Sequence, residues 1–390
     1  MKFIPYGRQT ISEEDIKSVI DTLKSDYLTQ GPKIEIFEKE VNKYLGCDYS
    51  IAVNSATSAL HIACMALGLR EGDYLWTSPI TFVASANCAR YCNANVDFVD
   101  IDITTGLISI DKLKEKLVNA KEKGCLPKVL VPVHLTGSSC NMEEIYKLSR
   151  IYGFKIIEDA SHCFGASYKN QKIGNCRYSS ITVFSFHPVK IITTGEGGIA
   201  TTNDHQLAIE MGKLRSHGIT KDESLFVNKS LGPWFYEQQQ LGYNYRMTDI
   251  HASLGLSQLK RIDEIVKERQ NIQNIYEQSL IDEPITFLKR SEDVYSSVHL
   301  VVIILNQKFI NFYREIFTYL RESNIGVQLH YLPVHLQPYY KKLNFKEGDF
   351  PSAELYSKLA ISLPVFPGLS KKDQGYIIER LKIILKSYTT

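Results

Sequence analysis

The stretch Phe184-Ser185-Phe186-His187-Pro188-Val189-Lys190-Ile191-Ile192-Thr193-Thr194-Gly195-Glu196-Gly197-Gly198 decides how this sequence is interpreted. It places one lysine, Lys190, among apolar and small residues, and a glycine-rich turn follows. Such neighbours exclude water from a lysine, which lowers its pKa and leaves the amine free to attack an aldehyde. The stretch therefore predicts a Schiff-base lysine. A lysine that only reaches from a strand end into solvent would explain neither the flanking hydroxyls nor the glycines.

Around this stretch, short apolar runs alternate with helix-length amphipathic segments from about residue 12 to residue 218. We expect helices over 12–25, 33–45, 56–67 and 81–92 and from residues 111 and 142. We expect strands over 51–53, 74–77, 96–99, 128–134, 155–158, 181–186 and 198–201. Because strands separated by helices need crossover connections, the pattern predicts an α/β fold with a mostly parallel sheet covered on both faces.

The length of 390 residues predicts two domains, a large one over 1–250 and a smaller C-terminal α+β domain over 251–390. The segment 220–240 contains Gly232-Pro233 and a run of glutamines, which breaks the pattern and indicates an exposed excursion. Residues 249–269 are expected to form one long helix that links the domains.

Composition and charge exclude several classes of protein. With 45 basic and 43 acidic residues the net charge is +2, so no basic footprint for nucleic acid is expected. The sequence starts without a signal-peptide pattern and contains no membrane-length apolar window. Its eight cysteines are scattered without a Cys-x-x-Cys pair, which indicates reduced thiols, a cytoplasmic location and no metal site.

Two further segments have residues suited to a phosphorylated cofactor. Asp159 follows an apolar strand, where an acid can pair with a protonated pyridine nitrogen, although a turn-capping aspartate is an equal alternative. Asn54-Ser55-Ala56-Thr57 begins a helix after a strand, and its free amides and dipole can bind an anion, although serine and threonine are also ordinary N-caps. Pyridoxal phosphate (PLP) requires three groups: a helix N-terminus for its phosphate, a carboxylate for its pyridine nitrogen and a desolvated lysine for its aldehyde. The sequence offers all three.

These motifs resemble the DegT/StrS type of PLP-dependent sugar-nucleotide aminotransferases, of fold type I. The resemblance covers nearly the whole chain, and within the family it is greatest to the transaminases of pseudaminic acid biosynthesis. The motifs that carry it are Leu28-Thr29-Gln30-Gly31, Asn54 to Leu60, Pro79-Ile80-Thr81-Phe82, Ser185 to Lys190, Arg215-Ser216-His217-Gly218, Gly242 to Arg246 and Gln328-Leu329-His330-Tyr331.

The resemblance implies a cofactor site in which Lys190 holds PLP, Asp159 pairs with the pyridine nitrogen and His162 lies near the 3-hydroxyl. Phe82 would stack on the ring. Ala56, Thr57 and Ser185 would bind the phosphate, and Asn244 would reach it from the neighbouring subunit of a homodimer. The implied walls of the sugar-nucleotide site are Tyr6, Asp26, Tyr27, Leu28, Thr29, Gln328, Leu329, His330 and Tyr331.

The implied reaction moves the amino group of L-glutamate to C4 of a UDP-linked 4-keto-6-deoxy-N-acetylhexosamine. A related 4-keto sugar, of the bacillosamine or legionaminic acid branch or linked to dTDP, is the nearest alternative. Dehydration is disfavoured because the relatives that perform it lack the lysine, and a PLP-binding regulator is disfavoured because the site motifs are intact. His134 and His187 follow apolar strand residues and are interpreted as packed, hydrogen-bonded core histidines.

Overall fold

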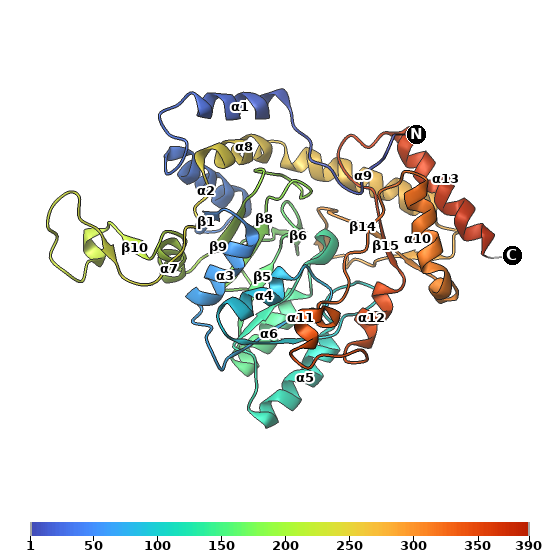
Figure 1. The fold of residues 1–390 in the computed structure, drawn as a ribbon, viewed down its shortest axis with the longest axis horizontal. Coiled ribbons are helices and arrows are strands. Elements are labelled where there is room, and N and C mark those ends of the chain that lie inside the picture. Colours follow the sequence, from blue (N-terminus) through green and yellow to red (C-terminus); the bar gives the residue numbers. More distant parts are fainter. Residues whose placement is uncertain (1, 389–390) are drawn as a thin grey trace.

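The structure, a computed structural model, describes residues 2–388. Its centre is a mixed, mostly parallel sheet with seven strands in the described residues (Figure 1). In spatial order the strands are β1 (Tyr49–Val53), β9 (Gly198–Thr202), β8 (Ile181–Ser185), β5 (Lys155–Asp159), β4 (Val129–Val131), β2 (Tyr74–Thr77) and β3 (Asn95–Phe98). The neighbours from β8 to β3 are parallel, whereas β9 runs antiparallel to both β8 and β1.

The side chains of β8 and β9 are buried at every position rather than at alternate ones. A strand with both faces buried is covered on both sides, as the sequence pattern predicted. The helices around this sheet are α1 (Glu13–Leu23), α2 (Pro32–Leu45), α3 (Ala56–Ala66), α4 (Ala84–Tyr91), α5 (Ile110–Lys123), α6 (Met142–Tyr152), α7 (His205–Arg215) and α8 (Asp249–Leu259). The fold is thus the α/β class predicted.

Local sequence accounts for where these helices begin and end. Ser12 and Asp15 form a reciprocal capping box at the start of α1, and the side chain of Ser55 accepts the amide of Ser58 at the start of α3. Helix α2 begins at Pro32 and ends at Gly46, which has a φ of 74°. Glycine adopts this left-handed conformation without a Cβ penalty, so it terminates the helix there.

The single helix expected over 249–269 is wrong, because the chain forms α8 and then α9 (Ile262–Ser279). At the junction Arg261 leaves the helical region with φ −112° and ψ 9°. Its guanidinium donates to Oδ2 of Asp15 on α1 at 2.6 Å, and Gln258 donates to the same oxygen at 2.5 Å. This fully buried carboxylate therefore holds both sides of the break.

The C-terminal part forms a second layer at the right of Figure 1, around the antiparallel sheet β12-β14-β15. Its elements are β12 (Ile285–Phe287), β14 (Val301–Leu305), β15 (Ala360–Leu363), α10 (Tyr313–Glu322), α11 (Pro338–Lys341), α12 (Pro351–Ser357) and α13 (Lys371–Ser387). Except for α11 and α12, whose buried residues join the core of the large sheet, these elements bury a separate core that also takes in Ile4. The amide of Ile4 donates to the carbonyl of Asn324 at 2.9 Å. The boundary at residue 250 stays a prediction.

Arg269 joins α9 to this C-terminal layer. Its guanidinium is 1% exposed and donates to the carbonyls of Val298, His299 and Val365 at 3.2–3.4 Å. Burial lowers its pKa to about 10. The segment Ser296 to Leu300, which follows β13 (Val294–Tyr295), is thereby fixed against α9, and this segment reaches the site described below.

The segment 220–240 projects from the body at the left of Figure 1, between the short strands β10 (Ile219–Thr220) and β11 (Glu237–Gln238). Val227, Trp234 and the following Leu241 have exposed fractions of 84%, 75% and 73%. The expected exposed excursion is therefore present. No helix within residues 2–388 is both long and apolar enough to span a membrane.

Candidate active site

Lys190 lies in the turn between β8 and β9, which closes on itself through backbone and hydroxyl contacts. The amide of Phe186 donates to the carbonyl of Gly197 at 2.9 Å, and Thr193 Oγ1 and the amide of Thr194 donate to the carbonyl of Phe186 at 2.9 and 3.0 Å. The hydroxyls that flank the lysine in the sequence therefore shape its turn.

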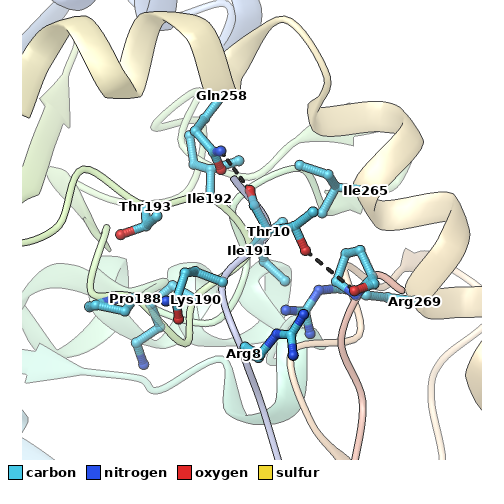
Figure 2. Close-up of a pocket in the computed structure, with 12 residues that line it drawn as sticks. Arg8, Thr10, Pro188, Lys190, Ile191, Ile192, Thr193, Gln258, Ile265 and Arg269 are labelled. Atoms are coloured by element: carbon cyan, nitrogen blue, oxygen red, sulfur yellow. Dashed lines mark hydrogen bonds between the residues drawn. The ribbon is translucent and has the colours of Figure 1, made fainter. Parts of the chain in front are cut away.

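One side of this turn packs against the N-terminal segment and the linking helices around a small gap (Figure 2). Gln258 donates to the carbonyl of Thr10 at 2.9 Å, and Thr10 Oγ1 donates to the carbonyl of Pro367 at 3.3 Å. Arg269 borders the same small gap, whose volume of about 10 Å³ suits a single water molecule. The lysine turn thus rests on three parts of the chain that are distant in sequence.

The amine of Lys190 has the chemistry that its sequence context predicts. Burial lowers its pKa from 10.5 to about 8, and the negative charge of Asp159 opposes the shift. About a tenth of the amine is therefore unprotonated at pH 7, far more than for a solvated lysine, and the unprotonated form is the nucleophile toward an aldehyde.

Asp159 ends β5 and is held as an oriented carboxylate. It is 6% exposed, its Oδ2 accepts from Ser85 Oγ at 2.5 Å, and its Oδ1 accepts from the amide of Ser161 at 3.1 Å. Ser85 Oγ also lies 2.7 Å from Thr81 Oγ1. The sequence did not single out Ser85, because a serine inside a helix carries no signal of its function.

A close backbone approach brings the expected phosphate-binding residues together. Ser185 is directly opposite Gly198 in the antiparallel pair of β8 and β9. A Cβ on Gly198 would lie 2.4 Å from the amide nitrogen of Ala56, so only glycine lets the start of α3 lie against the sheet here. Ala56 and Thr57 at the N-terminus of α3 therefore lie beside Ser185.

These groups line one cavity of about 730 Å³. The predicted residues that border it are Tyr6, Ala56, Thr57, Phe82, Asp159, His162, Ser185, Lys190, Gln328, Leu329, His330 and Tyr331. They come from both ends of the chain and from the centre, so the fold alone assembles them. A volume of this order accommodates a cofactor together with part of a substrate.

His162 and the segment Gln328 to Tyr331 form the wall beside Lys190. His162 Nε2 lies 3.2 Å from the hydroxyl of Tyr331, and His330 Nδ1 lies 2.8 Å from Ser362 Oγ. Burial and the nearby Lys190 lower the pKa of His330 to about 3, so its imidazole is neutral at physiological pH. Two neutral histidines and a phenol thus offer hydrogen bonds rather than charges to a ligand.

Phe82 and Tyr6 supply aromatic surface at the cavity. Phe82 is 58% exposed for a large apolar side chain, and its ring centroid lies 6.3 Å from that of Tyr331. The ring of Tyr6 lies 5.0 Å from His330, and burial raises the pKa of the Tyr6 hydroxyl. An exposed phenylalanine at a cavity mouth is available to cover a flat ring.

Five predicted residues do not border this cavity. Tyr27 and Leu28 are 55% and 47% exposed, and the carbonyl of Leu28 accepts the amide of Asp249 at 3.0 Å. Thr29 forms a bridge with Thr248, and Asp26 precedes this segment on the exposed surface. Asn244 is also exposed and forms a bridge with Ser216. These five residues can make their expected ligand contacts only if a second subunit places its own cavity against this surface.

The interpretation of His187 as a packed core histidine is wrong, because it is exposed and borders the cavity. It follows the last residues of β8, where the chain leaves the sheet, so its side chain is no longer covered. His134 is a buried core histidine as expected. Its Nδ1 accepts from the amide of Cys140 at 3.2 Å and its Nε2 lies 2.8 Å from Glu158 Oε2.

The sequence also missed His299 and Glu196, which border the same cavity. The ring of His299 lies 4.2 Å from that of His162. Only its place in the C-terminal layer brings His299 here, and nothing in the local sequence indicates that. Within residues 2–388, no group of three or more His, Cys, Asp or Glu side chains is placed to hold a metal ion, and all eight cysteines are free thiols.

Relatives in sequence match almost the whole chain. Spore coat polysaccharide biosynthesis protein SpsC of Bacillus subtilis is 39% identical over 98% of this chain and 97% of its own. The UDP-4-amino-4,6-dideoxy-N-acetyl-beta-L-altrosamine transaminase of Campylobacter jejuni is 37% identical over 98% of both chains.

Solved structures agree with this similarity. Helicobacter pylori PseC, an aminotransferase involved in the biosynthesis of pseudoaminic acid, superimposes with a TM-score of 0.91 at 32% identity over 99% of this chain and 100% of its own. The PLP form of the putative sugar aminotransferase Spr1654 of Streptococcus pneumoniae superimposes with a TM-score of 0.89 at 29% identity over the full length of both chains. Residues 9–382 match the DegT/DnrJ/EryC1/StrS aminotransferase family, whose members use PLP, and the chain belongs to that family.

Proposed function

We propose that this aminotransferase acts on a UDP-linked 4-keto sugar in pseudaminic acid biosynthesis. L-glutamate donates the amino group, and C4 of UDP-2-acetamido-2,6-dideoxy-β-L-arabino-hex-4-ulose accepts it. The product is UDP-4-amino-4,6-dideoxy-N-acetyl-β-L-altrosamine. The altrosamine transaminase of C. jejuni and PseC of H. pylori support this substrate, since both match nearly the whole chain.

The residues of the cavity fit PLP by the chemistry of their donors. A lysine with a pKa of about 8 and an oriented carboxylate border the same cavity as the N-terminus of α3, whose free amides suit a phosphate. The close approach of Gly198 to Ala56 brings that helix terminus beside Ser185. This meeting of three distant segments is the observation that carries the assignment of PLP, whereas the substrate rests on the similarity to the altrosamine transaminase and PseC.

In this assignment Lys190 holds the cofactor, Asp159 pairs with its pyridine nitrogen, and Ala56, Thr57 and Ser185 bind its phosphate. Phe82 covers the ring, and His162 lies toward its 3-hydroxyl. PLP supplies the electron sink that makes amino transfer possible. The Nζ of Lys190 would hold and return the proton that amino transfer displaces, a task that suits its pKa of about 8.

The sugar-nucleotide wall is assigned to Tyr6, Gln328, Leu329, His330 and Tyr331 at the cavity and to Asp26, Tyr27, Leu28 and Thr29 on the adjoining surface. Asn244 contacts the phosphate of the neighbouring subunit, so the enzyme is a homodimer with shared sites. Its scattered free thiols support a cytoplasmic location. The exposed position of Asn244 after the projecting segment 220–240 supports this arrangement.

A substrate panel tests the proposal. The protein loaded with PLP is incubated with L-glutamate and a set of UDP- and dTDP-linked 4-keto sugars, and products are identified by mass spectrometry and NMR. We expect the UDP-β-L-arabino-hex-4-ulose to be aminated at C4 with the highest kcat/KM. Preference for the bacillosamine or legionaminic acid precursor, or for a dTDP sugar, would assign the enzyme to that alternative instead.

A further inference from the structure

His162 has one hydrogen-bond partner at each ring nitrogen, and the two partners differ in kind. The backbone amide of Thr136 points at Nδ1 at 3.3 Å, and the hydroxyl of Tyr331 lies 3.2 Å from Nε2. A backbone amide can only donate, so Nδ1 must accept and cannot carry a proton. The hydroxyl of Tyr331 can accept or donate, so it leaves Nε2 free to carry the proton.

The surroundings of His162 keep its imidazole neutral. Burial, then the charge of the nearby Lys190, lower its pKa well below the ordinary value, and the residue is 5% exposed. The ring of His299 packs against it at 4.2 Å and is kept neutral by its own burial. A neutral imidazole with an accepting Nδ1 carries its one proton on Nε2, the nitrogen that faces Tyr331 at the cavity.

A loop with two consecutive left-handed residues orients the backbone amide of Thr136 toward His162. Thr136 has a φ of 63° and Gly137 a φ of 97°, both in the left-handed region that favours glycine. The carbonyl of Thr136 accepts from the amides of His299 at 2.9 Å and Leu300 at 3.3 Å. The segment Ser296 to Leu300, which Arg269 holds in place, therefore fixes the carbonyl of Thr136, while the amide of the same residue donates to His162.

The same segment also fixes the backbone of His162. Ser297 Oγ donates to the carbonyl of His162 at 2.7 Å, and the amide of Ser297 donates to the carbonyl of Gly137 at 3.2 Å. A Cβ on Gly137 would lie 2.7 Å from Ser297 Oγ and 2.8 Å from the amide of Val298. Glycine is thus required for the loop to approach this closely.

We propose that Thr136 and Gly137 are positioning residues that fix His162 as the Nε2–H tautomer, so that it presents a hydrogen-bond donor to the cavity. In this structure the oxygen of Tyr331 lies within reach of that donor. The 3-oxygen of PLP is an acceptor of the same kind, and a donor directed at it favours its ionised form. The role toward PLP rests on the proposed function, whereas the tautomer is a property of the chain itself.

Nitrogen NMR on the protein without PLP tests the tautomer. The protein is labelled with ¹⁵N-histidine, and the His162 signals are assigned by their loss in His162→Gln. We expect Nδ1 to resonate as an unprotonated nitrogen and Nε2 as a protonated one, from neutral pH to below the pKa of free imidazole. A protonated Nδ1, a doubly protonated ring or averaging of the two nitrogens overturns the proposal.

A pair of glycine variants tests the loop. Gly137→Ala should displace the Thr136 amide and turn the single His162 tautomer into a mixture. The matched control is Gly153→Ala, because Gly153 also has a positive φ, 81°, but a Cβ there meets nothing within 4 Å. If Gly137→Ala does not fold, Ser297→Ala loosens the hold of the segment Ser296 to Leu300 without added volume and should shift the same signals. An unchanged tautomer in a folded Gly137→Ala protein would contradict the positioning role.

Two substitutions of His162 separate the donor from a structural role. The amide of Gln reaches the Nε2 position and can donate there, whereas the shorter amide of Asn reaches only the Nδ1 position, where it can accept from Thr136. We expect His162→Gln to bind PLP at least tenfold more tightly than His162→Asn. The pH titration of the bound cofactor's visible absorbance should also stay closer to that of the wild type in His162→Gln. The reverse order overturns the donor role. Absence of PLP binding in the wild-type protein would refute the proposed function but leave the NMR result intact.

Discussion

The pKa of Lys190 governs how fast the protein can capture an aldehyde. Burial lowers this pKa from 10.5 to about 8, so the unprotonated fraction rises tenfold per pH unit below about 8 and then levels off. We expect the rate of PLP capture by the cofactor-free protein to follow this curve in stopped-flow absorbance. A rate that keeps rising up to pH 10.5 would show that Lys190 is solvated as an ordinary lysine.

Asp159 should matter for turnover more than for PLP affinity. Asp159→Asn keeps the shape and the contact with Ser85 but removes the negative charge that keeps the pyridine nitrogen protonated. We expect kcat to fall by orders of magnitude while PLP stays bound, measured by steady-state kinetics and absorbance. A rate within about threefold of wild type, less than about 1 kcal/mol, would end the assignment of this role.

Sequence reasoning at the residue scale succeeded where chemistry is local. Lys190 and Asp159 could be singled out because an apolar context and a strand end are visible in the sequence. Ser85 and His299 could not, because each becomes part of the site only through contacts with distant segments. His187 was misjudged although the predicted strand 181–186 ends within a residue of β8, because whether the turn that follows is covered depends on tertiary packing.

The break between α8 and α9 depends on a buried carboxylate from another element. Asp15→Ala should remove the acceptor of Arg261 and one of the two acceptors of Gln258, at a cost of about 2–4 kcal/mol in the free energy of unfolding. Urea denaturation followed by circular dichroism measures this loss. Glu13→Ala, in the same turn but exposed, is the control and should change stability by less than about 0.5 kcal/mol. Equal effects in the two variants would contradict the anchoring role of Asp15.

At the scale of elements, most strands and helices of the large domain followed from periodicity and caps, although α7 was not predicted and the strand expected over 128–134 is only Val129–Val131. The strand Tyr74–Thr77 and the helix end at Gly46 occur where the sequence predicts them. The break near Arg261 could not be predicted, because the helical pattern runs through it and the deciding partner, Asp15, lies about 240 residues earlier. The local hydrophobic pattern therefore predicts where helices and strands form, whereas contacts with distant residues determine where a helix is interrupted.

At the scale of the whole molecule, the exposed Asn244 predicts a site shared between two subunits. A hybrid dimer of a Lys190→Ala chain and an Asn244→Ala chain should contain one intact site, built from Lys190 of one chain and Asn244 of the other. Differently tagged variants are co-expressed, and the purified hybrid is assayed. We expect activity well above that of either homodimeric variant. Activity no higher than that of the Asn244→Ala homodimer would mean that Asn244 acts within its own subunit.

The central claim, that Lys190 and PLP carry an amino group from glutamate to a UDP-4-keto sugar, is tested most directly by isotope transfer in two separate steps. The PLP-loaded protein is treated with ¹⁵N-glutamate, freed of glutamate by gel filtration and mixed with UDP-2-acetamido-2,6-dideoxy-β-L-arabino-hex-4-ulose. The account predicts ¹⁵N at C4 of the sugar, up to one per active site, and none with Lys190→Ala. A sugar that gains no ¹⁵N, or gains as much with Lys190→Ala, would contradict it.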